Sequence, residues 1–370
     1  MKILVAVADY SLPGKAGSHF FVQTRNLYYK EYGKDIEIEV LNFNTKEDYI
    51  VDGIQVYSLD TYRKELVQKR YDLLVSHQPN IRNHYFFFTK YEKNFPKLIF
   101  VFHGHEVLNV NKVYSPPYAY SKKASFFKKA FQELYDRTKL SLWRSYYPKL
   151  SHKSHFLFVS RWMYDEFIKW TKISPQVIQN CHSITYNCIG SSFEKESYDY
   201  ENKKEFDFIT IRGNLDGSKY CIDLVNQMAK DNPNFRFLVI GKGKFFEYNE
   251  KADNLEWIDT HLTHEEIIKY LNVSRCALMP TRTDAQGLMM CEMATFGMPL
   301  ITSNIPVCSE VFEGFQNVRF IDNEDRQINL EPLLYSLEKD WLYKYKKNEK
   351  YFAVNTVGKE IELFKKILAI

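Results

Sequence analysis

A carboxylate and a glycine that could act together on a ligand stand within residues 280–299 of this 370-residue chain. We expect a helix over 288–296 that is apolar on nearly every side, with Glu292 in its middle. A buried carboxylate needs hydrogen-bond donors, which either ligand hydroxyls or the protein's own backbone, Arg or Lys groups would supply. At the N-terminus of this helix, Gly287 and Leu288 offer unpaired N–H groups and a positive dipole end, which suit a phosphate.

The stretch 280–299 resembles the signature P-S-x-x-E-G-x-G-x-x-x-x-E-A-x-A-x-G-x-P of the retaining glycosyltransferases of family 4. The matching residues are Pro280, Gly287, Glu292, Gly297 and Pro299, and the departures are Thr281, Asp284, Ala285, Met293 and Thr295. The resemblance implies an α/β protein with the GT-B fold, in which two Rossmann-like, doubly wound domains face a central cleft. It also implies that Glu292 binds the ribose of a donor nucleotide, and that Asp284 contacts the donor sugar beside the Gly287 and Leu288 backbone. Asp284 is one methylene shorter than the usual Glu, so it keeps the charge but has less reach.

Basic residues follow the first expected strand of the second half. Arg212 and Lys219 resemble the family's basic pair, which neutralises the donor diphosphate; the alternative is a solvated turn with two cations. Gly241 ends a later strand and resembles the family's nucleotide-facing loop, although two glycines are a weak signal. The turn at 187–190 resembles a family turn before the linker, and we interpret it as structural.

In the first half, the expected strand 98–102 runs directly into His103-Gly-His105-Glu106. Ligands bind beyond the carboxyl ends of parallel strands, so this pair of histidines should face the cleft. The resemblance favours His103 as the catalytic residue near the donor sugar, with His105 and Glu106 as the second candidate and His77 as a weaker one. Gly17, in the loop after the first strand, should lie across from the donor.

The chemistry implied by the resemblance is a retaining, metal-independent hexosyl transfer in which no protein carboxylate acts as nucleophile. No D-x-D metal motif is evident, and His103 and His105 on an extended segment lack a third metal ligand. We therefore expect no metal and no cofactor, because the nucleotide-sugar is itself a substrate. The expected donor sugar is a hexose or an N-acetylhexosamine, and the expected acceptor is a glycan or a lipid-linked glycan of cell-surface polysaccharide synthesis.

Short apolar strands alternate with helix-length segments along the whole chain, which is typical of parallel sheets built from βαβ units. The expected strands are 3–7, 36–41, 72–76, 98–102, 156–159, 208–211, 235–240, 255–258, 277–279, 300–302 and 318–321. The expected helices are 18–32, 82–91, 220–230, 264–271, 288–296, 330–338 and 354–370. We predict an acceptor-side domain over 1–190, a polar linker over 191–206, a nucleotide-sugar domain over 207–350, and a final helix over 351–370 that packs back on the first domain.

Composition supports two folded domains in a reducing compartment. Hydrophobic residues make up 45% and charged residues 26% of the chain, which suits globular cores. No apolar run reaches the length of a membrane span, and the six cysteines form no C-x-x-C pair. These features indicate a cytoplasmic protein.

One basic segment stands out in a chain of net charge +4, because residues 111–154 carry ten Lys or Arg against two acidic residues. We expect a helix over 122–143 whose basic and aromatic residues would suit the headgroups of an anionic membrane at the inner membrane face. The alternative is a core-packed helix with a solvated Lys face, and nucleic acid is disfavoured because no recognised motif accompanies the charge. The proposed patch comprises Lys122, Lys123, Phe127, Lys128, Lys129 and Phe131, with Leu134, Thr138, Lys139, Leu140 and Trp143 further along the helix.

Two other functions compete with a glycosyltransferase. A non-catalytic GT-B subunit that binds a partner enzyme or a glycan would keep the fold, and Asp284 in place of Glu favours it. A dinucleotide-dependent oxidoreductase would need G-x-G-x-x-G after a first strand, and neither half of the chain has it.

Overall fold

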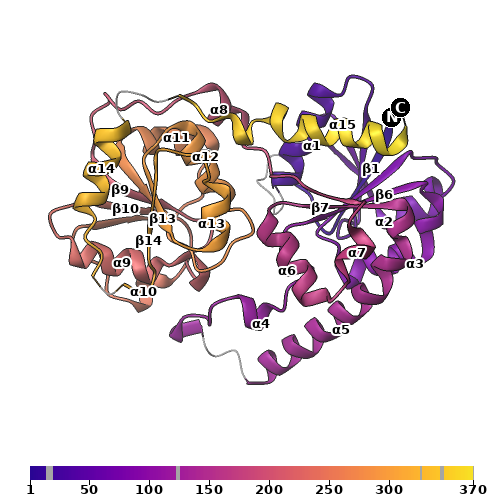
Figure 1. Ribbon diagram of the computed structural model, residues 1–370, viewed down its shortest axis with the longest axis horizontal. Helices are drawn as coiled ribbons and strands as arrows, with labels where there is room; N and C mark the ends of the chain where they lie inside the picture. Colours follow the sequence, from indigo (N-terminus) through magenta and orange to yellow (C-terminus); the bar gives the residue numbers. More distant parts are fainter. Residues whose placement is uncertain (14–19, 122–125, 326, 342–345, 370) are drawn as a thin grey trace. The chain divides into compact units, whose positions relative to one another are not determined.

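A computed structural model describes residues 1–13, 20–121, 126–325, 327–341 and 346–369 (Figure 1). These residues form two compact units. Unit 1 contains residues 1–110, 133–188 and 350–370, and unit 2 contains residues 111–132 and 189–349. The chain therefore passes from one unit to the other four times.

Unit 1 is built on an eight-stranded sheet in the order β3-β4-β2-β1-β5-β6-β7-β8. All neighbours are parallel except β3 and β4, which form an antiparallel hairpin around Asp52 and Gly53. The strand order reverses direction between β1 and β5, so ligands are expected beyond the carboxyl ends of those two strands. The strands are β1 (Lys2–Val7), β2 (Glu37–Asn42), β3 (Tyr49–Val51), β4 (Ile54–Ser58), β5 (Leu73–His77), β6 (Lys97–Phe102), β7 (Ser154–Phe158) and β8 (His182–Ile184).

The helices of unit 1 cover both faces of this sheet. α15 packs against α1, and their apolar residues join those of β1 and β5 in one core. Both ends of the chain thus lie on unit 1 (Figure 1). The helices are α1 (Phe20–Tyr32), α2 (Leu59–Thr61), α3 (Phe86–Tyr91), α5 (Phe126–Leu150, which begins in unit 2), α6 (Arg161–Thr171), α7 (Pro175–Ile178) and α15 (Val357–Leu368).

Unit 2 has a fully parallel six-stranded sheet in the order β11-β10-β9-β12-β13-β14, the strand order of a Rossmann fold. Its reversal lies between β9 and β12, which pair directly. The strands are β9 (Phe206–Ile211), β10 (Phe237–Ile240), β11 (Leu255–Ile258), β12 (Ser274–Leu278), β13 (Leu300–Ser303) and β14 (Val318–Ile321). The helices are α8 (Ser191–Lys195), α9 (Ile222–Asp231), α10 (Phe245–Tyr248), α11 (His264–Asn272), α12 (Leu288–Phe296), α13 (Pro306–Val311) and α14 (Glu331–Trp341), and α4 (Val110–Val113) begins at the unit boundary.

The prediction of two Rossmann-like α/β domains is confirmed, and the eleven strands expected from the sequence all coincide with observed strands. The two halves differ from the predicted boundaries in two respects. Residues 111–132 belong to unit 2 rather than to the first domain. Residues 191–206 are not a bare linker, because Phe193 is buried and the Tyr198 hydroxyl donates to the Ser274 carbonyl at 2.7 Å. The central cleft stays a prediction.

Candidate active site

The loop between β12 and α12 is shaped by a glycine at the start of the helix. Gly287 has a φ of +73°, a left-handed conformation that few side chains tolerate. A Cβ atom at this position would lie 2.1 Å from Cε of Met290. Because the helix begins here, the N–H groups of Leu288, Met289 and Met290 have no intrahelical acceptor and present a positive dipole end.

Asp284 folds the same loop. Its Oδ1 accepts hydrogen bonds from the N–H groups of Ala285 (2.8 Å), Gln286 (3.3 Å) and Gly287 (2.9 Å). Such a turn depends on a short acidic or amide side chain that reaches its own backbone, which a Glu would do less well. The structure thus gives Asp284 a role in forming the loop. Its contact with a donor sugar stays a prediction, and the carboxylate oxygen available for it is Oδ2.

Glu292 is 3% exposed in the middle of α12. Its Oε1 accepts from the N–H of Gly190 at 3.1 Å and lies 3.7 Å from Nε2 of His264. Burial raises the pKa of Glu292 to about 7, and the Gly190 N–H offsets only part of that rise. Burial also lowers the pKa of His264, so the imidazole beside Glu292 is neutral at neutral pH. The sequence left open whether ligand hydroxyls, the backbone or an Arg or Lys would donate to Glu292. The donor observed in the structure is the backbone N–H of Gly190.

Gly190 was missed as a site residue, since the turn at 187–190 was interpreted as structural only. A Cβ atom on Gly190 would lie 2.4 Å from the His264 ring and 3.5 Å from Oε1 of Glu292. Only glycine therefore lets this backbone approach the carboxylate and the imidazole together. His264 was missed because it lies on α11, and nothing in the sequence connects it with α12.

Arg212 follows β9 and points its guanidinium toward the end of β12. Its Nη2 donates to the carbonyl of Pro280 at 2.7 Å, and the guanidinium lies 5.1 Å from the Tyr220 ring. The side chain is buried, and its Nε has no hydrogen-bond partner within the described residues. Burial lowers the pKa of this Arg, although it stays a cation, and Asp284 acts in the opposite direction. A buried cation with an unpaired N–H suits an anionic ligand.

Lys219 and Gly241 complete the set predicted for unit 2. The ammonium of Lys219 lies 4.7 Å from the Tyr220 ring centre and 5.5 Å from that of Tyr114. A Cβ atom at Gly241 would lie 2.0 Å from the Arg212 carbonyl oxygen, so Gly241 allows these two loops to pack. The N–H of Arg282 donates to the Lys219 carbonyl at 2.8 Å, which joins the loops after β9 and β12. The structure thus brings Arg212, Lys219 and Asp284 together at the switch point of the sheet.

In unit 1, His103 directly follows β6, as expected. Its Nε2 lies 3.1 Å from Nδ1 of His77, so one ring donates and the other accepts, and its ring centre is 4.5 Å from that of Phe21. Glu106 is buried and accepts from the N–H groups of His103 and Gly104, the latter at 3.0 Å. Glu106 therefore holds the turn in place, and burial raises the pKa of its carboxyl group. The His105 side chain is exposed.

The expectation for Lys139 is wrong, because this residue is buried. Its ammonium pairs with Asp136 at 2.7 Å and donates to the carbonyls of His105 (2.6 Å) and Leu108 (2.8 Å). Lys139 therefore stabilises the loop after β6 and does not contribute positive charge to the protein surface.

The remaining patch residues that are described lie at the start of α5. Lys128 and Lys129 are exposed, and Phe131 and Leu134 are 67% and 63% exposed. Further along the helix, Leu140 and Trp143 are buried, so only the first turns fit the surface interpretation. Gly17, Lys122, Lys123 and the side chain of Phe127 lie outside the described residues. Among the described residues, none of the helices is both long and apolar enough to span a bilayer.

The loops after β9 and β12 can be compared with known families. Residues 192–353 match the family model described as glycosyl transferases group 1. The matched range contains Arg212, Lys219, Asp284 and Glu292. The O-antigen biosynthesis glycosyltransferase WclY from Escherichia coli is 28% identical over 146 residues, which are 35% of this chain and 40% of that protein. The alignment thus spans less than half of its relative.

Solved structures of similar fold cover nearly the whole chain. HepE from Anabaena, solved in complex with UDP, is 13% identical with a TM-score of 0.65 and covers 99% of this chain and 100% of its own. Sucrose-phosphate synthase from Thermosynechococcus elongatus is 12% identical with a TM-score of 0.65 and covers 100% and 99%. WaaG, a glycosyltransferase involved in lipopolysaccharide biosynthesis, is 11% identical with a TM-score of 0.58 and covers 92% and 90%. These likenesses confirm the predicted fold of two Rossmann-like domains, and the assignment to family 4 stays a prediction.

Proposed function

We propose that this chain is a glycosyltransferase that moves a hexose or N-acetylhexosamine from a nucleotide-sugar to a glycan or lipid-linked acceptor. The observation that carries the proposal is Glu292, a buried carboxylate that accepts one backbone hydrogen bond. Such a group destabilises the free protein unless a ligand supplies further donors, and the paired hydroxyls of a ribose are suitable donors. The phosphate-binding features beside it make a nucleotide the best candidate.

The diphosphate would be held by three positive groups of unit 2. Arg212 offers an unpaired Nε, Lys219 offers an ammonium that forms no ion pair within the described residues, and α12 offers its N-terminal N–H groups. These groups would stabilise the charge that develops on the leaving diphosphate. Protein groups alone would thus stabilise the departing nucleoside diphosphate. We therefore propose a metal-independent reaction with no cofactor.

In unit 1, His103 would lie at the reacting sugar. Its partner His77 restrains the ring through the 3.1 Å contact between their nitrogens, and a residue that contacts a transition state needs such a fixed position. Retention of the anomeric configuration is what the family resemblance implies. In the mechanism usually proposed for that family, the donor phosphate accepts the proton of the acceptor hydroxyl, and no carboxylate forms a covalent intermediate.

The acceptor would belong to cell-surface polysaccharide synthesis. Support comes from two similar proteins, the O-antigen biosynthesis glycosyltransferase WclY and the structural neighbour WaaG, which is involved in lipopolysaccharide biosynthesis. The exposed start of α5, with Lys128 and Lys129 beside Phe131, would place the enzyme at an anionic membrane surface, where lipid-linked acceptors are found.

The test begins with thermal unfolding in the presence of UDP-, ADP-, GDP- and dTDP-sugars. A donor at one hundred times its Kd should stabilise the protein by about 2.7 kcal/mol. The stabilising donor is then incubated with the enzyme, with and without EDTA, and release of the nucleoside diphosphate is measured. Absence of binding by every nucleotide-sugar would refute the proposal, and loss of activity in EDTA would refute metal independence alone.

A non-catalytic GT-B subunit is the second candidate, and one observation favours it. Oδ1 of Asp284 accepts hydrogen bonds from three N–H groups of its own loop, so only the other carboxylate oxygen remains for a sugar. Tight binding of a nucleotide-sugar without release of the nucleoside diphosphate, in the presence of bacterial glycolipid acceptors, would favour this candidate.

A further inference from the structure

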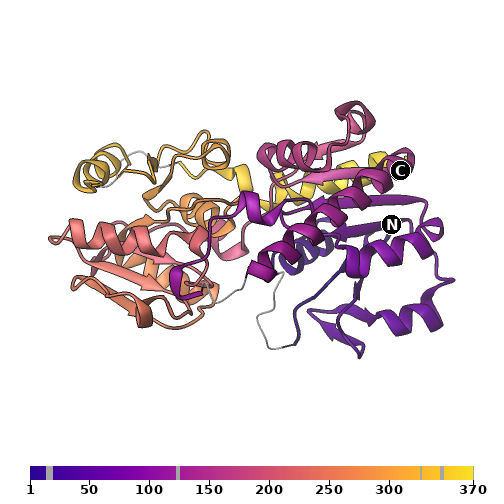
Figure 2. The ribbon, with the colours of Figure 1, turned by 90° about the horizontal axis from the view of Figure 1, so that it is seen from below.

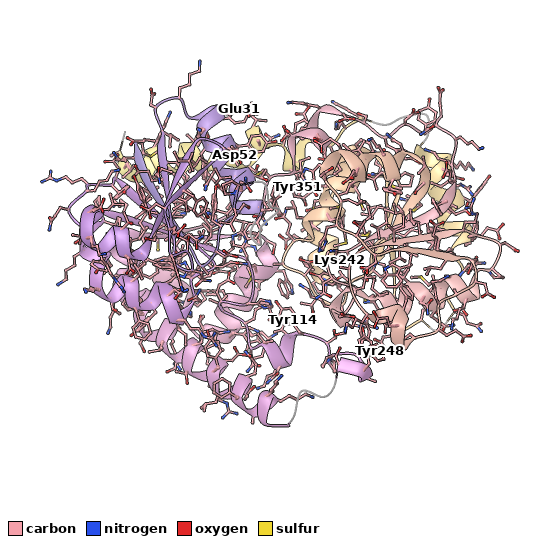
Figure 3. The ribbon with its side chains drawn as sticks, turned by 180° about the vertical axis from the view of Figure 1, so that it is seen from behind. Glu31, Asp52, Tyr114, Lys242, Tyr248 and Tyr351 are labelled. Atoms are coloured by element: carbon pink, nitrogen blue, oxygen red, sulfur yellow. The ribbon has the colours of Figure 1, made fainter. Side chains whose placement is uncertain are left out.

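A segment from the first half of the chain forms part of the donor-binding unit. Residues 111–121, here named the strap, belong to unit 2 although they follow directly on the loop after β6. The strap lies beside α9 and α10 (Figures 1 and 2), and it ends with the one-turn helix Ala119–Ser121. Tyr114 of the strap and Tyr248 of α10 are labelled in Figure 3.

Tyr118 of the strap caps α9. The residue before this helix, Cys221, has a φ of 55° and provides no side-chain cap. The hydroxyl of Tyr118 takes that place, because it accepts from the N–H of Ile222 at 3.1 Å and donates to Oδ1 of Asp223 at 3.0 Å. Loss of a helix N-cap typically lowers the stability of a protein by about 1 kcal/mol. The Tyr118 hydroxyl therefore helps to stabilise the start of α9.

Two further contacts fix the ends of the strap on the same loop. Near its start, the hydroxyls of Ser115 and Ser218 lie 2.9 Å apart. Near its end, Tyr120 donates to Asp216 at 2.7 Å and stacks on the Tyr248 ring, with centres 4.7 Å apart and planes 5° from parallel. The loop that carries Lys219 is therefore attached to the strap on both sides of that residue.

The strap also contacts the loop between β12 and α12. The hydroxyl of Thr283 donates to the Val113 carbonyl at 3.0 Å. Asp223, which receives the Tyr118 hydrogen, is bound by both guanidinium nitrogens of Arg282 at 2.9 and 2.8 Å. The strap thus connects the two loops that hold Lys219 and Asp284.

Tyr114 is the strap residue nearest to a donor-binding cation. Its ring lies 5.5 Å from the Lys219 ammonium, and the Tyr220 ring lies 4.7 Å from the same atom. Within the described residues, Lys219 forms no ion pair with a carboxylate. Aromatic faces hold a cation without neutralising it, so the ammonium keeps its full charge for an anion.

We infer that Tyr114 is a positioning residue for the donor diphosphate, and that the strap completes the donor site of unit 2. The ring limits the rotamers of Lys219 and holds its ammonium where the distal phosphate of a nucleoside diphosphate binds. The inference rests on the proposed function, since it assumes that Lys219 contacts the diphosphate.

The test uses the full chain and calorimetric titration with UDP, ADP, GDP and dTDP and with the matching monophosphates. Tyr114→Leu should weaken binding of the diphosphate about 3- to 30-fold, as expected for loss of a cation–π contact, and change monophosphate binding less than 2-fold. Tyr114→Phe keeps the aromatic face and should retain wild-type affinity. Tyr335→Leu, which changes a tyrosine 65% exposed on α14, is the matched control.

A double-mutant cycle separates positioning from general damage. In the Lys219→Gln background, Tyr114→Leu should have no further effect on diphosphate affinity, because the cation that it positions is absent. An equal loss in both backgrounds, or equal losses for diphosphate and monophosphate, would overturn the inference and leave the proposed function standing. If the wild-type chain binds none of the four diphosphates, the proposed function fails and the inference fails with it.

Discussion

Replacement of Glu292 by Gln should make the free protein more stable and the nucleotide complex weaker. The amide has the shape of a protonated carboxyl group and can still accept the Gly190 N–H, which lies 3.1 Å from Oε1. It differs in one respect, because it cannot ionise. The comparison therefore isolates the cost of a buried negative charge in the absence of ligand.

The magnitude follows from the pKa of Glu292, which rises from 4.5 to about 7 on folding. Below pH 4.5 the carboxyl group is protonated in both states. Between pH 4.5 and 7 the unfolded chain releases its proton first, so stability falls as the pH rises. Above pH 7 the loss is complete at about 3 kcal/mol, taking 1.36 kcal/mol for each pH unit of difference. Glu292→Gln should thus match the wild type at pH 4.5 and exceed it by about 3 kcal/mol at pH 8.

The assay is thermal and urea unfolding of both proteins at pH 4.5, 6 and 8 without ligand. The gain at pH 8 should raise Tm by on the order of 10 °C. Under the same conditions, nucleotide binding by the variant should weaken by about 1–3 kcal/mol, and the wild type should bind more tightly as the pH rises through 7. A variant less stable than the wild type at pH 8 would contradict the buried-charge argument, and unchanged affinity would contradict the ribose assignment.

Three further predictions concern other parts of the molecule. His103→Ala should reduce turnover far more than nucleotide affinity, because its contact would form mainly in the transition state. Glu360→Gln should destabilise the protein by about 3–5 kcal/mol in urea unfolding, because it leaves the buried guanidinium of Arg25, now 2.8 Å from Oε1, without a counter-charge. Changing Lys128 and Lys129 to Gln should weaken sedimentation with anionic vesicles at low salt, at about 1 kcal/mol for each residue.

Each of these experiments has a matched control. His105→Ala tests an exposed neighbour of His103, and equal losses of turnover and affinity in His103→Ala would reassign that residue. For Glu360, the double variant Arg25→Met/Glu360→Leu removes both charges and should recover most of the lost stability. In the vesicle experiment, changing the exposed Lys365 and Lys366 of α15 to Gln should leave sedimentation unchanged. If the wild-type protein did not sediment with anionic vesicles at low salt, the membrane proposal would be refuted.

The parallel sheets could be predicted because buried strands leave a strong local signal. The run at 3–7 is apolar at every position, and the structure extends it by one residue to Lys2–Val7. The hairpin β3–β4 was missed, although Asp52-Gly53 is a typical hairpin turn, because only three residues precede it in β3. The short β8 (His182–Ile184) is only half-buried and carries no comparable signal.

The candidate site could be predicted only where its residues fall within one motif. Glu292 and Gly287 lie on 280–299, whereas Gly190 and Tyr114 lie about 100 and 180 residues earlier, and only the tertiary fold brings them to the site. Lys139 illustrates the opposite error. Charge along a helix suggested a solvated face, but Asp136 one turn earlier and two loop carbonyls satisfy this cation inside the fold.

The four crossings between the units have a consequence for the order of synthesis. Most of unit 1 leaves the ribosome before most of unit 2, yet unit 1 also needs residues 350–370, which leave the ribosome after all of unit 2. Until then, Arg25 lacks the carboxylate of Glu360, and Tyr29 and Thr185 lack the acceptor that they share in the folded chain. Domains usually fold in order from the N-terminus during translation. Here the second unit can mature first, and the first unit remains open to chaperones and proteases until α15 closes it.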